Sequence, residues 1–179
     1  MSQLKVNSIV PAGGLPSGAN GGIIQVVSTT KTDAFSTTSS SFTDITGFSA
    51  TITPSSNSNK ILVIVTLNGF GTASDSSDFG GMMVLVRGST QIAIGDAAGS
   101  RSRASIGLPS RSGAQGLLQQ SGSISHLDSP ATTSATTYKV QARHTQGSEV
   151  RLNMNIHDSS DNANRVRSAS CITLLEVST

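Results

Sequence analysis

The chain has 179 residues, a net charge of +2 at neutral pH, one cysteine and no tryptophan. This length suits one domain with a short extension, and the small net charge argues against a nucleic-acid binder, which would carry a dense basic stripe. No apolar run approaches the roughly 20 residues that a bilayer span needs, and residues 1–10 lack the pattern of a secretion signal. We therefore expect a protein made in the cytoplasm, without membrane insertion.

Residues 1–21 differ in composition from the rest of the chain. A stretch rich in proline and glycine, residues 11–21, breaks both helix and sheet. It follows a short apolar patch of four residues, Leu4, Val6, Ile9 and Val10. One interpretation is a frayed terminus. We favour an extended N-terminal arm that attaches to a neighbouring subunit or a larger particle, because a solvated tail has no need of four large apolar residues.

From Gly22 to the end, short apolar segments alternate with clusters of Gly, Ser, Asn and Pro, which is typical of strands and turns. No window shows helical periodicity. We predict an all-β domain over 22–179, an antiparallel β-sandwich of jelly-roll type. The predicted strands are 22–29, 45–53, 60–68, 82–87, 90–96, 122–127, 136–145, 148–156 and 170–178.

Two hairpins stand out in this pattern. Residues 87–89 form a tight connection between the strands at 82–87 and 90–96. Strict alternation of apolar and polar residues on both sides of 146–148 predicts a second hairpin over 136–156, with one face buried and the other in water.

Three predicted strands are apolar on both faces, which a two-layer sandwich cannot cover. In 61–67, 82–86 and 171–177 one alternating set faces the core and the other remains uncovered. A second copy of the chain is the simplest cover, and closed symmetry favours a homotrimer or a dimer. We take six residues as candidates for a subunit interface: Leu62, Ile64, Met83, Leu85, Ile172 and Leu174.

Two long segments, 69–81 and 97–116, carry few apolar residues and are expected to be loops. The second holds Arg101, Arg103 and Arg111, the most distinctive charged feature of the chain. A solvated loop is the simplest interpretation. The alternative is contact with an acidic partner, either another particle protein or an anionic glycan of a cell surface, because arginine suits carboxylates and phosphates.

Several phrases of this sequence resemble a known family. They include LVRGSTQIAIGD at 85–96, LDSPATTSATTYKVQAR at 127–143 and the closing ITLLEV at 172–177. They are similar to virion proteins of marine phages, notably cyanophages, of the tail-fibre, appendage or structural type. The apolar strand near the C-terminus also resembles in placement that of trimeric C1q and tumour-necrosis-factor jelly rolls. The resemblance implies a component of a virion, synthesised in the host cytoplasm.

No motif indicates catalysis or a cofactor. A turn is predicted after the end of a strand at His157, Asp158 and Asp161, with a bound cation as the alternative. For His126 and Asp128 we likewise predict a turn, with a bound cation as the alternative. His144 is expected to be buried or at an interface. Cys171 lies in an apolar run and is expected to be a buried thiol.

The leading hypothesis is therefore a non-enzymatic structural component of a phage particle, such as a fibre, appendage or decoration protein. It would assemble as a homotrimer and dock on capsid or tail proteins through its arm. The alternative is a receptor-binding module whose loops contact a host glycan or protein. A polysaccharide-cleaving enzyme has least support, because no pair of carboxylates stands out.

Overall fold

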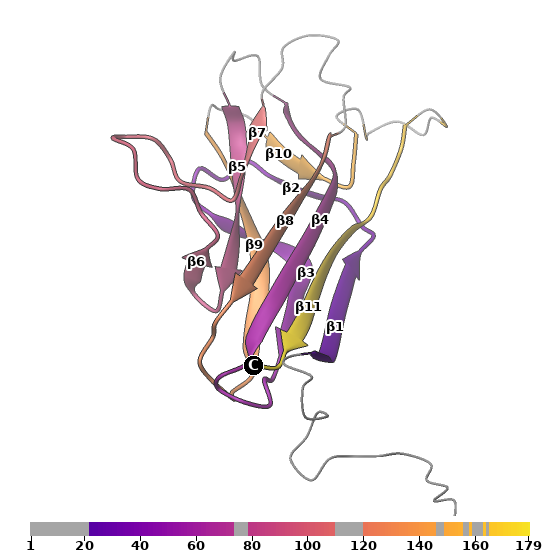
Figure 1. Ribbon diagram of the computed structural model, residues 1–179. Coiled ribbons are helices and arrows are strands. Elements are labelled where there is room, and N and C mark those ends of the chain that lie inside the picture. Colours follow the sequence, from indigo (N-terminus) through magenta and orange to yellow (C-terminus); the bar gives the residue numbers. More distant parts are fainter. Residues whose placement is uncertain are drawn as a thin grey trace, which may run out of the picture.

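The structure, a computed structural model, is a β-sandwich (Figure 1). It describes residues 22–73, 79–109, 120–145, 149–155, 158, 163 and 165–179. The strands of the first sheet are β1 (Ile23–Lys31), β2 (Phe35–Thr37), β4 (Lys60–Ala73), β8 (Gln120–Asp128), β10 (Glu149–Leu152) and β11 (Ser170–Val177). The second sheet holds β3 (Thr43–Ile52), β5 (Phe79–Arg87), β6 (Thr90–Ile92), β7 (Ile106–Pro109) and β9 (Thr136–His144).

The two sheets are antiparallel, and successive long strands alternate between them. The first sheet has the order β1-β11-β4-β10-β2, with β8 on the other side of β4. The second has the order β3-β9-β5-β6, with β7 also paired to β5. The first and last strands of the domain are neighbours. This order is compatible with the predicted jelly roll, whereas the likeness to trimeric C1q and tumour-necrosis-factor domains stays a prediction.

The core lies between the two sheets and follows from the alternation of each strand. In β4, Ile61, Val63, Val65 and Leu67 point inward and are fully buried, as the sequence pattern predicted. Across from them, the second sheet contributes its own alternate residues, among them Phe48, Met83, Leu85, Tyr138 and Val140. The described part of the chain contains no helix long and apolar enough to cross a membrane.

A buried carboxylate fastens the connection between β3 and β4 to the last strand. The side chain of Glu176 is 1% exposed. Its Oε1 accepts hydrogen bonds from Ser55 N at 2.7 Å, Ser55 Oγ at 2.8 Å and Asn59 Nδ2 at 2.6 Å. Burial acts to raise the pKa of Glu176, but these hydrogen bonds outweigh it and hold the pKa below its usual value. The carboxylate therefore replaces its lost hydration with protein donors.

A second polar cluster fastens the opposite end of β11. Asn153 is fully buried and has a positive φ of 61°. Its Nδ2 donates to the carbonyl of Lys31 at 2.8 Å and to that of Asp33 at 3.1 Å, and its Oδ1 accepts from Ser170 Oγ at 2.6 Å. One side chain thus ties the chain after β10 to the ends of β1 and β11.

Most predicted strands are present, but the hairpin predicted over 136–156 is wrong. Strand β9 belongs to the second sheet, where it pairs with β3 and β5. Strand β10 belongs to the first sheet, where it pairs with β4 and β2. Both alternate in the same way because both face the shared core, from opposite sides. The hairpin predicted around residues 87–89 is confirmed, since β5 pairs with β6.

Candidate functional site

The outer face of the first sheet carries an aligned row of aliphatic side chains. The register places Val26 of β1 opposite Leu175 of β11, Leu175 opposite Leu62 of β4, and Leu62 opposite Leu127 of β8. Because neighbouring strands lie about 4.8 Å apart, the four side chains form one continuous stripe across the sheet. We call Val26, Leu62, Leu127 and Leu175 the aliphatic row.

Much of this row is exposed to solvent. Val26 is 58% exposed and Leu127 is 49% exposed, while Leu62 and Leu175 are partly buried between them. Ile64, which is 37% exposed, lies two residues along β4 on the same face. At the start of β1, Ile23 and Ile24 are 58% and 43% exposed. These residues account for most of the large exposed hydrophobic side chains in the described part of the chain.

The rest of the outer face is uncharged and rich in hydroxyl groups. One cross-strand line runs through Ser28, Thr173, Ile64 and Ser125, and the next through Thr30, Cys171, Thr66 and Ser123. Among the outward-facing residues of these four strands, Lys60 at one end is the one charged side chain. Such a face neither attracts a charged partner nor repels a copy of itself.

Cys171 lies on this outer face, two cross-strand lines away from the aliphatic row, and is partly exposed. The prediction of a buried thiol is therefore wrong, because the inward residues of β11 are Ile172 and Leu174 rather than Cys171. Burial acts to raise the pKa of Cys171, but hydrogen bonds with Ser28, Thr173 and Thr30 outweigh it and lower the pKa below its usual value. The thiol is thus a chemical probe of this surface.

The structure separates the six residues predicted to form a subunit interface. Leu62 and Ile64 lie on the outer face, and their contact with a second copy stays a prediction. Met83, Leu85, Ile172 and Leu174 are fully buried in the core of one protomer. The prediction for these four is wrong, because the inward and outward sets of β5 and β11 were assigned the wrong way round.

The outer face of the second sheet is covered by the chain itself. Met82, Val84 and Val86 point outward from β5, yet each is less than 8% exposed. Arg143 of β9 approaches Met82, with Nε 3.4 Å from the sulfur, and its Nη2 donates to Ser102 Oγ at 2.9 Å. The connection between β6 and β7 therefore lies against this face. Among the residues that the structure describes, the apolar outer residues left uncovered are those of the first sheet.

The remaining predicted site residues are spread over other parts of the molecule. Arg101 and Arg103 are exposed in the connection between β6 and β7, where Arg103 Nε donates to the carbonyl of Gly95 at 2.6 Å. Arg111 and the four apolar residues of the arm, Leu4, Val6, Ile9 and Val10, lie outside the described residues.

The residues considered for chemistry do not assemble into a metal centre within the described ranges. Asp158 pairs with Arg167, whereas His157 and Asp161 lie outside those ranges. Among the described residues, no three His, Cys, Asp or Glu side chains lie close enough together to hold a metal ion. His144 is partly buried, and its Nδ1 is a buried atom with no hydrogen-bond partner.

The sequence singles out Asp128 only together with His126, and it does not predict the polar cluster around Asp128. Asp128, at the end of β8, is 6% exposed and accepts two hydrogen bonds from Arg87 Nη1, at 2.8 and 2.9 Å. The Tyr138 hydroxyl donates to Asp128 Oδ2 at 2.6 Å, and both burial and this contact raise the pKa of Tyr138 far above its usual value. His126 Nε2 lies 3.9 Å from Asp128 Oδ1. The cluster joins the two sheets, and no spacing in the sequence signals it.

The comparisons with known proteins add no identity to this geometry. Neither a protein-family model nor a curated protein matches the chain.

Proposed function

We propose that this protein is a non-enzymatic structural component of a phage particle that assembles as a homotrimer through the outer face of its first sheet. The aliphatic row carries the assembly part of the proposal. The particle part rests on the resemblance of residues 85–96, 127–143 and 172–177 to phage virion proteins. A fibre, appendage or decoration protein fits a chain of this length.

A copy of the same chain is the partner that best fits the face. The face has no charge pattern for an acidic or basic protein to read, and its flanking hydroxyl groups can pair with an identical surface. Four strands of about nine residues present roughly 600 Å² per subunit at the usual strand spacing and rise. Together with the surface of the next subunit that covers it, such a face approaches the roughly 1,200 Å² at which specific interfaces begin.

The mass of the full chain in dilute solution tests the proposal. We expect about 55 kDa, three times the 18.3 kDa of one chain, by light scattering after gel filtration at micromolar concentration. We also expect Cys171, the single cysteine, to react with a maleimide more slowly as the protein concentration rises. A species of 18.3 kDa with a thiol reactivity independent of concentration would contradict self-assembly.

Attachment to the particle is tested separately. We expect that the chain without residues 1–21 still has the solution mass of three subunits. We expect that it is no longer incorporated into particles. Normal incorporation of the truncated chain, measured by immunogold labelling of purified particles, would refute the role of the arm.

The second candidate function is receptor binding, and it is favoured by the way the two ends of the sandwich differ. Ser178 N donates to the Gly22 carbonyl at 3.0 Å, so the described chain begins and ends at the same end of the sandwich (Figure 1). At the opposite end, the pairing of Ala73 with Glu149 and of Phe79 with Pro109 brings the ends of four strands together. A module anchored at one end would present the other to a host surface.

This second candidate has its own test. Changing Arg101, Arg103 and Arg111 together to Ala should reduce adsorption of phage to host cells without changing the mass of the assembly. Unchanged adsorption would refute receptor binding through these arginines, and the architectural role would be the function that remains.

A further inference from the structure

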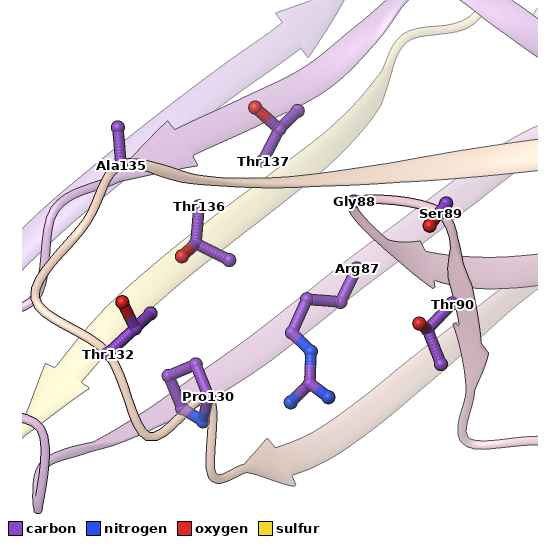
Figure 2. A pocket seen from close by; sticks show the side chains of 9 residues that line it. All are labelled: Arg87, Gly88, Ser89, Thr90, Pro130, Thr132, Ala135, Thr136 and Thr137. Atoms are coloured by element: carbon purple, nitrogen blue, oxygen red, sulfur yellow. The ribbon is translucent and has the colours of Figure 1, made fainter.

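A polar pocket lies beside the Asp128 cluster, between the turn of the β5–β6 hairpin and the connection from β8 to β9. Its volume is about 400 Å³. Figure 2 shows the Arg87 guanidinium between Pro130 on one side and Thr90 on the other. The lining residues are Arg87, Gly88, Ser89, Thr90, Pro130, Thr132, Ala135, Thr136 and Thr137. No aromatic ring is among them, so a ligand would be held by hydrogen bonds rather than by stacking.

Arg87 is held in place while part of it stays available. Its Nη1 donates to both carboxylate oxygens of Asp128 and to the carbonyl of Ser129 at 3.3 Å. Tyr138 fixes Asp128 in turn. Among the described residues, nothing accepts a hydrogen bond from Nε or Nη2 of Arg87. These two atoms form the edge of a guanidinium that binds a carboxylate through two parallel hydrogen bonds.

Hydroxyl groups surround this edge and divide into two sets. Thr132 Oγ1 accepts from Ser134 N at 3.0 Å, and Thr136 Oγ1 donates to the Ser134 carbonyl at 3.0 Å. These bonds hold the wall formed by the β8–β9 connection. Ser89 and Thr90, on the opposite wall, have no hydrogen-bond partner for their hydroxyls within the described part of the chain, which leaves donors and acceptors for a ligand.

We propose that this pocket binds the carboxylate of an acidic sugar. The carboxylate would accept from Nε and Nη2 of Arg87, and the sugar hydroxyls would exchange hydrogen bonds with Ser89 and Thr90. Asp128 already balances the charge of Arg87, so an anion gains little from net attraction. Recognition then depends on the geometry of the guanidinium edge together with the hydroxyls, which favours a sugar acid over a bare carboxylate or a neutral sugar.

Titration of the full-length, ¹⁵N-labelled protein with D-glucuronate, acetate and D-glucose tests this proposal. We expect saturable shifts of the amide signals of Gly88, Ser89 and Thr90 with glucuronate, and binding of acetate and glucose weaker by about tenfold, the effect of about 1.4 kcal/mol. Acetate binding as tightly as glucuronate would overturn the sugar part of the proposal. The absence of saturable shifts with glucuronate would overturn the site.

Two variants separate the pocket from the fold. Ala135→Leu places a larger side chain in the pocket without removing any partner of Asp128, and we expect it to weaken glucuronate binding at least about tenfold. Arg87→Lys keeps a positive charge near Asp128 but removes the two-donor edge, and we expect a similar loss. Ala97→Leu, at an exposed position of the β6–β7 connection, is the matched control. Glucuronate binding unchanged in Ala135→Leu would refute the assignment.

Discussion

Replacing Val26 with threonine is expected to weaken the proposed trimer while leaving the fold intact. Threonine keeps the β-branched shape that suits a strand and exchanges one methyl group for a hydroxyl. Val26 is 58% exposed in the protomer, so more than half of its surface remains to be buried on assembly. Fully burying a valine contributes at least about 1.5 kcal/mol, and we expect a loss of about 1 kcal/mol per subunit. For three subunits this is about 3 kcal/mol, or roughly 150-fold in the trimer dissociation constant.

Val166→Thr is the matched control, because Val166 is also 58% exposed but lies outside the two sheets, in the segment before β11. Sedimentation velocity over a concentration series measures the dissociation constant, and urea unfolding measures the stability of each protomer. We expect Val26→Thr to shift the series toward 18.3 kDa and Val166→Thr to leave it unchanged, with both variants within about 0.5 kcal/mol of the natural protein in stability. Equal effects of the two substitutions on the mass distribution would refute the aliphatic row as the interface.

Three further predictions concern the stability of the sandwich, measured as the free energy of unfolding in urea. Glu176→Gln should cost about 1–2 kcal/mol at pH 7. Because the folded-state pKa of Glu176 is lowered, the carboxylate stabilises the fold above its unfolded pKa near 4.5 and loses this contribution as the pH falls through the folded pKa. The difference in stability between the two proteins should therefore vanish in acid. A difference that stayed constant as the pH was lowered from 7 through the acid range would contradict this. Asn153→Ala should cost about 2–3 kcal/mol, because it leaves two carbonyls and a hydroxyl without their buried partner; a loss below about 0.5 kcal/mol would show that water replaces the amide. Gly69→Ala should cost clearly more than Gly88→Ala. Both glycines have a φ near +57°, but the added Cβ would lie 2.3 Å from Ser168 Oγ at Gly69 and would meet nothing within 4 Å at Gly88. Equal losses would assign the whole effect to the left-handed backbone conformation, which costs an L-residue roughly 1–2 kcal/mol.

The sequence predicts the existence of strands better than their orientation. Alternation located most of the strands, because exposed polar residues interrupt the buried ones at every second position. In β5 both alternating sets are aliphatic, so periodicity cannot say which set faces the other sheet, and Met83 was assigned to the wrong face. The same limit explains the false hairpin: Tyr138 and Val150 show identical patterns because they face one core from two sheets.

In the candidate site, too, the sequence predicts some features and not others. Ile64 and Leu62 could be placed on the outer face because β4 carries its larger apolar set, including Ile61, on the inner one. The cover of the second sheet by Arg143 could not be predicted, since it depends on a connection folding back over β5. The Asp128 cluster joins residues 41 positions apart through side chains alone, and a lone Arg or Asp in a strand carries no signal of such a partner.

The position of the aliphatic row within the sheet bears on the symmetry of the assembly. Strand β1 is an edge of the first sheet, and Ile23, Ile24 and Val26 expose apolar side chains along it without a proline or a charge before Lys31. An edge of this kind is a template for pairing with another chain unless something covers it. Two copies packed face to face would bury the row but leave both β1 edges open. In a ring, the β1 edge of one subunit can lie against the row of the next, so that a single repeated contact covers both features and closes without a free end. The distribution of exposed aliphatic residues therefore favours a ring over a face-to-face pair. For a chain of 18.3 kDa, a measured mass near 37 kDa rather than 55 kDa would contradict this reasoning. The outer face would still be the contact in that case.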